Sequence, residues 1–162
     1  MTRYAQQTTV SVAKSRGEID ALLRQWGCDG IRWTDHYSRG IVALEFLWHR
    51  DNVDYLARFS IQLPDDKALR AEARHATSSR FLPAKFAKLQ AGRGRQEHRL
   101  LLLWLKAALN AVEAGIIEAE TIFLPFLVGR DGQTVAEAAL PRLQTLLVDG
   151  SRALLGIPET AG

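Results

Sequence analysis

Positive charge concentrated between residues 67 and 99 is the feature of the sequence with the clearest chemical meaning. This stretch holds nine Lys and Arg against two Glu, a formal charge of +7, so the other residues together carry −4 of the net +3. Such a segment attracts the phosphate backbone of a nucleic acid, because each contact releases condensed counterions. The cations that we expect to contact phosphates are Arg80, Lys85, Lys88, Arg93, Arg95 and Arg99.

Two aromatic residues, Phe81 and Phe86, lie among these cations and could stack on unpaired bases. The alternative is a solvated, charged connector whose aromatic side chains only pin it to the rest of the domain. The two interpretations differ in one structural consequence. A binding site requires the basic side chains to converge on one surface, whereas a connector leaves them scattered.

Other residues with reactive side chains do not form a recognisable site. The four histidines lack the spacing of a metal-binding helix, although His36 and His49 lie at predicted turns and could approach each other across a β-meander. Cys28 follows a predicted helix C-terminus, where the helix dipole opposes thiolate formation. The Gly-Arg-Gly-Arg run at 92–95 lacks the Lys-Ser/Thr of a phosphate loop. We therefore expect no catalytic residue, no metal and no cofactor.

The element around which the chain is organised is a helix predicted over Gln96–Gly115. Its first half is apolar almost all round, which predicts burial on several sides. Gly115 ends the helix. The apolar segment is too short, and too closely flanked by charged residues, to span a bilayer. The face predicted to be buried consists of Leu101, Trp104, Leu105, Ala108, Leu109 and Val112.

Three runs rich in β-branched and aromatic residues predict strands over 31–34, 41–49 and 53–63. Short turn sequences separate them, so the strands should form an antiparallel meander. The last run alternates strictly between apolar and polar residues, which is typical of a strand with one face on the core.

Predicted helices precede and follow the meander. Ser15 and Glu18 form a capping box before a helix that ends at Gly27, and an additional short strand is predicted over Thr8–Val12. Thr134 and Glu137 form a second capping box. The weakly patterned stretch at about 65–95 predicts short helices joined by mobile loops. The sequence therefore predicts one α+β domain over 1–162, with a meander packed against helices, a helical C-terminal part and a basic connector.

Three motifs resemble a family of small, uncharacterised phage and prophage proteins. They are the opening YA..T.V.V.KSR.EI..LL from Tyr4 to Leu23, the stretch Leu101–Ile116 with LK..L.AVE.GI, and Phe123–Leu124 followed by the DGxTV turn at Asp131–Val135. The resemblance implies a mobile-element origin and a shared fold. It transfers no catalytic residue.

These features predict a phage-type, non-enzymatic protein that binds DNA or RNA through its basic segment. One cysteine and the lack of an apolar leader favour the reducing cytoplasm of a bacterial host, with no membrane association. The alternative is a protein-binding module, such as an inhibitor of a host defence complex or a phage assembly component. Its interface would be the sheet edge or the C-terminal apolar segment, and its partner a protein complex of host or phage. A homo-oligomer is compatible with either.

Overall fold

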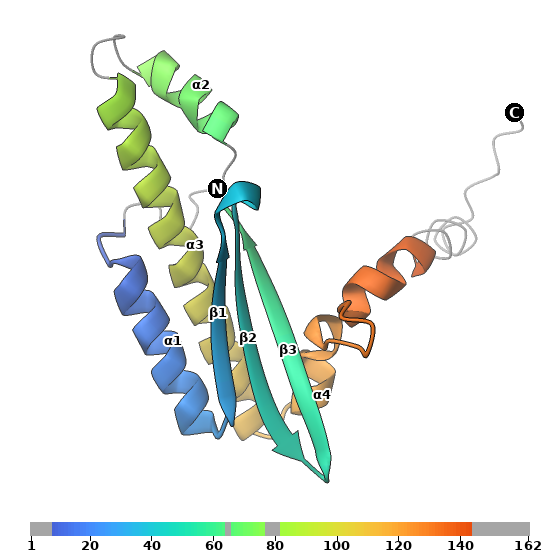
Figure 1. Cartoon of the computed structure of the whole chain (residues 1–162). Coiled ribbons are helices and arrows are strands. Elements are labelled where there is room, and N and C mark those ends of the chain that lie inside the picture. Colours follow the sequence, from blue (N-terminus) through green and yellow to red (C-terminus); the bar gives the residue numbers. More distant parts are fainter. Residues whose placement is uncertain (1–7, 64–65, 77–81, 144–162) are drawn as a thin grey trace, which may run out of the picture.

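A three-stranded antiparallel sheet with helices packed on one face makes up the main body of the protein (Figure 1). The structure is a computed structural model that describes residues 8–63, 66–76 and 82–143. The predicted α+β fold, with its antiparallel meander and helical C-terminal part, is confirmed. The elements are α1 Val12–Trp26, β1 Gly30–His36, η1 Tyr37–Arg39, β2 Ile41–Arg50, β3 Val53–Gln62, α2 Asp66–Ala76, α3 Leu82–Glu113, α4 Ala119–Ile122, η3 Leu124–Phe126 and a helix over 135–143.

Helix α1 begins earlier than the sequence predicts. The Ser11 hydroxyl accepts a hydrogen bond from the Lys14 amide at 3.1 Å, which makes Ser11 the N-cap. The predicted strand over Thr8–Val12 is therefore wrong, because residues 8–11 lie outside any strand and Val12 is already helical. The predicted capping box is wrong as well. Ser15 lies one turn inside α1 and is fully buried, in line with Ile19 and Leu23 on the packing face.

We expect the two serines of α1 to respond in opposite ways to replacement by alanine. Ser11→Ala should lower the free energy of unfolding by about 1 kcal/mol, because a first-turn amide loses its acceptor. Ser15→Ala should change it by less than about 0.5 kcal/mol or raise it, because the buried Ser15 hydroxyl has no partner among the described residues. Denaturant titration of both variants measures this, and a larger loss from Ser15→Ala would contradict the assigned N-cap.

The sheet presents an apolar inner face and a polar outer face. Strand β2 pairs with both neighbours, and Asp51 and Asn52 form a two-residue turn with positive φ at both positions, as a tight hairpin requires. Inner-face pairs such as Leu44 opposite Phe59 and Phe46 opposite Ala57 are buried. The predicted alternation of β3 is thus confirmed.

Within the stretch predicted to hold short helices joined by loops, residues 66–76 and 82–95 are helical. α2 is followed by α3, a single helix of 32 residues that runs from the basic segment into the predicted core helix. Packing between α2 and α3 buries Leu69 and Ala73, and this tertiary contact supports a stretch whose two glycines give it weak helix propensity. Pro83 is the second residue of α3, where its missing N–H costs nothing.

The C-terminal half of α3 is the centre of the core, as predicted. Leu105, Ala108 and Leu109 are buried, but Trp104 is 38% exposed and Leu102 is fully buried instead. The buried face is therefore rotated slightly from the predicted one. Figure 1 shows this half of α3 beside α1 and behind the sheet.

Replacement of Leu105 by alanine should lower the free energy of unfolding by about 2–5 kcal/mol, because a fully buried leucine loses transfer energy and leaves a cavity. The matched control is Lys106→Ala, one position further on the exposed side of α3, which should change it by less than about 0.5 kcal/mol. Equal losses in a urea titration would show that the buried face is assigned wrongly.

The second capping box is confirmed. The Thr134 amide donates to Glu137 Oε2 at 2.7 Å, and the Glu137 amide donates to the Thr134 hydroxyl at 3.2 Å. The preceding residues attach to the sheet, since Leu127 bridges to Ala57 and the Val128 amide donates to the Leu56 carbonyl at 2.8 Å. Within the described ranges, no helix combines the length and apolarity needed to cross a membrane.

Candidate nucleic-acid interface

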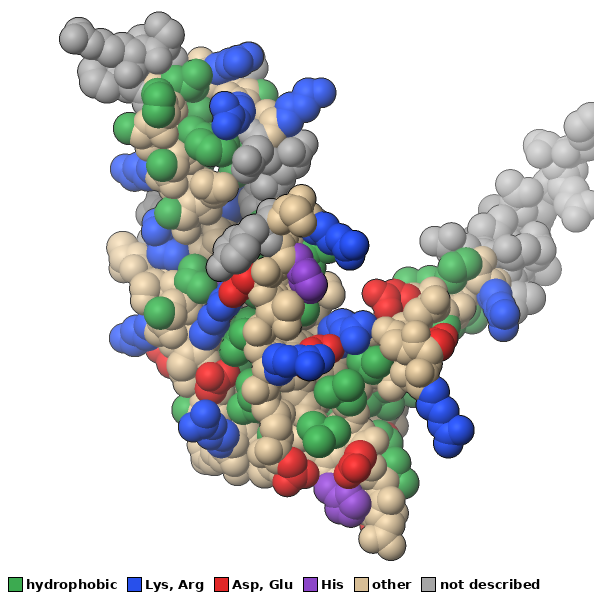
Figure 2. Space-filling view, viewed as in Figure 1, with side chains coloured by type: hydrophobic (Ala, Val, Ile, Leu, Met, Phe, Trp, Pro, Cys, Tyr) green, Lys and Arg blue, Asp and Glu red, His purple; other side chains and the backbone are tan. Residues whose placement is uncertain are grey.

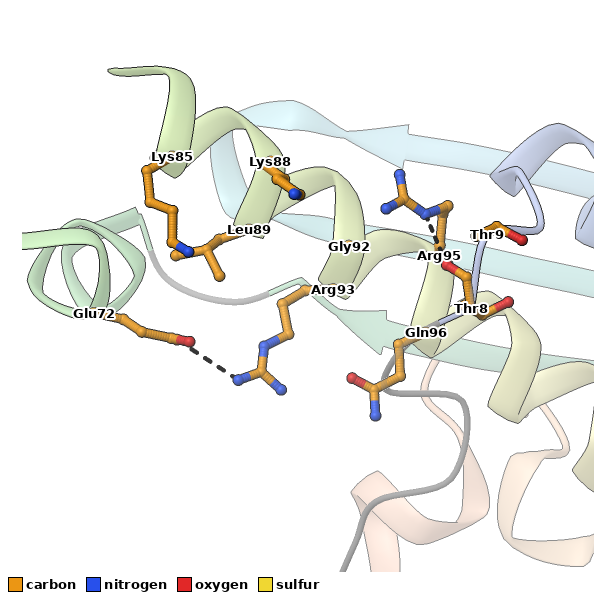
Figure 3. Close-up of a pocket in the computed structure, with 10 residues that line it drawn as sticks. All are labelled: Thr8, Thr9, Glu72, Lys85, Lys88, Leu89, Gly92, Arg93, Arg95 and Gln96. Carbon is orange, nitrogen blue, oxygen red and sulfur yellow. Dashed lines mark hydrogen bonds and ion pairs between the residues drawn. The ribbon is translucent and has the colours of Figure 1, made fainter. Parts of the chain in front are cut away.

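A basic groove lies where α2, the N-terminal half of α3 and the residues before α1 meet (Figure 3). Its volume is about 410 Å³. The packing of α2 on α3 forms one side of this groove, and Thr8 and Thr9 form the other. The described residues that line it are Thr8, Thr9, Glu72, Lys85, Lys88, Leu89, Gly92, Arg93, Arg95 and Gln96.

Four of the predicted contact residues line this basic groove, namely Lys85, Lys88, Arg93 and Arg95. Glu72 supplies the only carboxylate among the described lining residues. In Figure 3, Lys85 and Arg93 extend from α3 on the side where Glu72 lies, whereas Arg95 extends toward Thr8. The helical period places positions 85, 88, 92 and 96 on one face of α3, with positions 93 and 95 at its two edges, so formation of one continuous helix brings these cations to the groove.

The cations of the groove differ in how strongly they are engaged. Arg93 Nη2 lies 3.6 Å from Glu72 Oε2, and Arg95 Nε donates to the Thr8 carbonyl at 3.2 Å. Lys85 and Lys88 form no ion pair with any described residue, and Lys88 is exposed. The two lysines are therefore the groove cations whose charge is least compensated.

The remaining predicted contact residues do not join this groove. Arg99 pairs with Glu18 of α1 at 2.5 Å and so serves the α1–α3 contact. The Arg70 guanidinium carbon lies over the Phe86 ring, 4.9 Å from the ring centroid. Arg70 therefore occupies a face of the ring on which a base would have to stack. Arg80 and Phe81 lie outside the described residues.

A partly buried polar network beside the groove connects α3 to α1 and β1. Arg16 donates to both oxygens of Asp35, at 3.0 and 2.6 Å, and its Nε donates to His98 Nε2 at 3.1 Å. His98 is 2% exposed, its Nδ1 bonds the Gly94 carbonyl at 2.8 Å, and its ring stacks on Trp33. Burial lowers the pKa of His98, which keeps the ring neutral and able to accept from Arg16.

This network could not be predicted from the sequence. Its members are separated by up to 82 residues, and none belongs to a short motif. The one available signal is that Asp35 and His98 lie in apolar stretches around Trp33 and within α3, where a buried polar side chain needs a hydrogen-bond partner. Once α1 and α3 pack together, a lone histidine on an apolar face becomes a satisfied core residue.

The other candidate groups are placed where site chemistry is disfavoured. His36 pairs with Ile41 at one end of the sheet and His49 with Asp54 at the other, so the predicted approach of the two histidines is wrong. Burial raises the pKa of Cys28 to about 12, which leaves its thiol unreactive. Among the described residues, no group of three or more His, Cys, Asp or Glu could hold a metal ion.

Positive charge also extends beyond the groove. Figure 2 shows Lys and Arg side chains gathered over α2 and the beginning of α3.

No family model, curated protein or solved structure matches this chain. The resemblance to phage and prophage proteins therefore stays a prediction.

Proposed function

We propose that the protein binds nucleic acid, without an enzymatic activity, through the basic groove between α2 and α3. The observation that supports this proposal is that four of the predicted cations line one groove, in which Glu72 is the only carboxylate among the described lining residues. A scattered arrangement would have favoured a solvated connector. The Arg16–Asp35–His98 network attaches α3 to α1 and β1 one turn beyond Arg95.

The arrangement favours contact with the phosphate backbone over stacking on bases. Lys85 and Lys88 reach a phosphate without first breaking an ion pair with a described residue, and Arg93 can exchange its 3.6 Å contact with Glu72 for one with an anion. Phe86 is engaged by Arg70. Affinity should therefore depend on charge more than on base sequence, because phosphate contacts carry no direct sequence information.

The resemblance to phage and prophage proteins supports a cellular setting for this activity. A protein of that origin would meet DNA or RNA in the cytoplasm of its bacterial host. We propose this location together with the function.

A gel-shift series tests the proposal directly. Single- and double-stranded oligonucleotides are titrated with the full chain at several salt concentrations, and binding should be strongest at low salt. Failure of the unmodified protein to shift any oligonucleotide at about 50 mM salt would end the nucleic-acid proposal.

A second candidate function is binding to a protein, either another copy or a complex of host or phage. It is favoured by apolar side chains exposed in the C-terminal part, where Ile116 is 78%, Leu140 52% and Leu124 50% exposed. This candidate predicts no oligonucleotide shift at any salt concentration. It predicts instead that Leu140→Glu abolishes the complex while leaving the fold intact.

A further inference from the structure

The outer face of the sheet carries a second cluster of charged groups, separate from the basic groove. Helices α1 and α3 pack on the inner face, as Figure 1 shows. On the outer face, a groove of about 460 Å³ opens between the strands and the helix over 135–143. We call it the sheet groove. Its described lining includes Arg32, Thr34, Ala43, Arg58, Ser60 and Glu137.

One cross-strand row forms the charged wall of the sheet groove. Arg32, Glu45 and Arg58 lie directly opposite one another on β1, β2 and β3. Glu45 is 5% exposed and accepts from Arg32 Nε at 2.6 Å and from Arg58 Nε at 2.9 Å. Burial acts to raise the pKa of Glu45, but these hydrogen bonds outweigh it and hold the pKa below its usual value. One carboxylate thus holds two guanidinium groups together, and the row has a charge of +1.

Both guanidinium groups keep donors for a further partner. Each has five N–H donors. Arg32 pairs with Glu45 through Nε and Nη2, and its side chain is 69% exposed. Arg58 donates through Nε to Glu45 and through Nη1 to the Gly132 carbonyl at 2.8 Å, so its Nη2 is not used in these contacts.

The next row supplies a floor of small residues with free hydroxyl groups. Thr34, Ala43 and Ser60 lie directly opposite one another, one row along from the charged wall. The short Ala43 side chain leaves a depression in the middle strand. Neither the Thr34 nor the Ser60 hydroxyl has a hydrogen-bond partner among the described residues, and both line the sheet groove.

We propose that the sheet groove binds an oxyanion, the phosphate or carboxylate group of a small ligand, above Ala43. Arg32 and Arg58 would donate from the charged wall, and Thr34 and Ser60 from the floor. Charge-assisted hydrogen bonds of this kind are the strong ones in proteins. The carboxylates nearby are already engaged, since both Glu45 oxygens accept from arginine and Glu137 Oε2 accepts from the Thr134 amide.

The oxyanion site does not depend on the proposed nucleic-acid function. Its donors belong to β1 and β3, whereas the cations of the basic groove belong to α3. A failure of the protein to bind oligonucleotides would not affect the oxyanion proposal.

Backbone amide spectra of the ¹⁵N-labelled full chain test the proposal. Sodium phosphate and sodium succinate are titrated separately at constant ionic strength. We expect saturable shifts at the amides of Thr34, Ala43 and Ser60, and the probe that saturates identifies the phosphate or the carboxylate as the group bound. Arg32→Gln should weaken binding about tenfold, because one charge-assisted donor is lost. Thr34→Val should weaken it without a change of charge.

The matched control is Lys106→Gln, which removes a positive charge from the exposed side of α3 and should leave the titration unchanged. Thr34→Val covers the case in which Arg32→Gln disturbs the charged wall itself. The proposal is overturned if neither probe gives saturable shifts at these amides. It is equally overturned if both groove variants respond as the unmodified chain does.

Discussion

Truncation of Phe123 to alanine is expected to lower the free energy of unfolding by about 3–5 kcal/mol. Phe123 is fully buried, and its ring centroid lies within 5.4 to 6.3 Å of five others. Removal of the ring therefore loses transfer energy, leaves a cavity and breaks several edge-on aromatic contacts at once. The rings around it are Trp26, Phe46, Trp48, Phe59 and Trp104.

The neighbouring Leu124 offers a control for this prediction. It is 50% exposed, so Leu124→Ala should change the free energy of unfolding by less than about 1 kcal/mol. Urea titrations of both variants, followed by far-UV circular dichroism, measure the difference. Similar small losses for both would show that the segment after α3 does not complete the core.

The strands and the second capping box were predictable because their signals are local. The alternation of β3 follows directly from one face lying on the core, and Thr134 and Glu137 satisfy each other's amides within one turn. The apolar face of α3 was also predictable in outline. Its rotation toward Leu102 was not, because nearly all the residues around it are leucine and periodicity alone does not select among them.

The long helix α3 was not predicted, because tertiary contacts override the local signals of the basic segment. Gly92 and Gly94 weaken a helix by about 1 kcal/mol each relative to alanine, which favours loops in an isolated chain. Packing against α2 and the bond from His98 to the Gly94 carbonyl compensate for them. The start of α1 was missed for a related reason. The capping-box pattern with Glu18 favours Ser15 over Ser11 in sequence, and only the burial of Ser15 against its neighbours assigns the N-cap to Ser11.

The candidate site was predictable in composition and less so in membership. Lys85, Lys88, Arg93 and Arg95 converge as a binding surface requires, while Arg99 is committed to Glu18 and Phe86 to Arg70. Ion pairs across 81 residues leave no trace in local sequence. The sheet groove was not predictable from local sequence, because its donors come together only through the register of the strands.

Replacement of both Lys85 and Lys88 by glutamine should weaken nucleic-acid binding by roughly 25- to 60-fold at about 0.1 M salt. Each lost phosphate contact removes about 0.7 of the logarithmic salt dependence on single strands and about 0.9 on duplex. These two lysines are better probes than Arg93 and Arg95, whose contacts with Glu72 and the Thr8 carbonyl also support the fold. The thermal midpoint should change little, because uncompensated exposed charges contribute little to stability.

The measurement that tests nucleic-acid binding most directly is the slope of log affinity against log salt, by fluorescence anisotropy of a labelled oligonucleotide. The control variant, Lys106→Gln with Arg130→Gln, removes the same charge from exposed positions outside the basic groove. We predict a slope shallower by about 1.4 to 1.8 for Lys85→Gln with Lys88→Gln, and an unchanged slope for the control. Equal slopes for both double variants, or no binding by the unmodified protein, would contradict the proposed function.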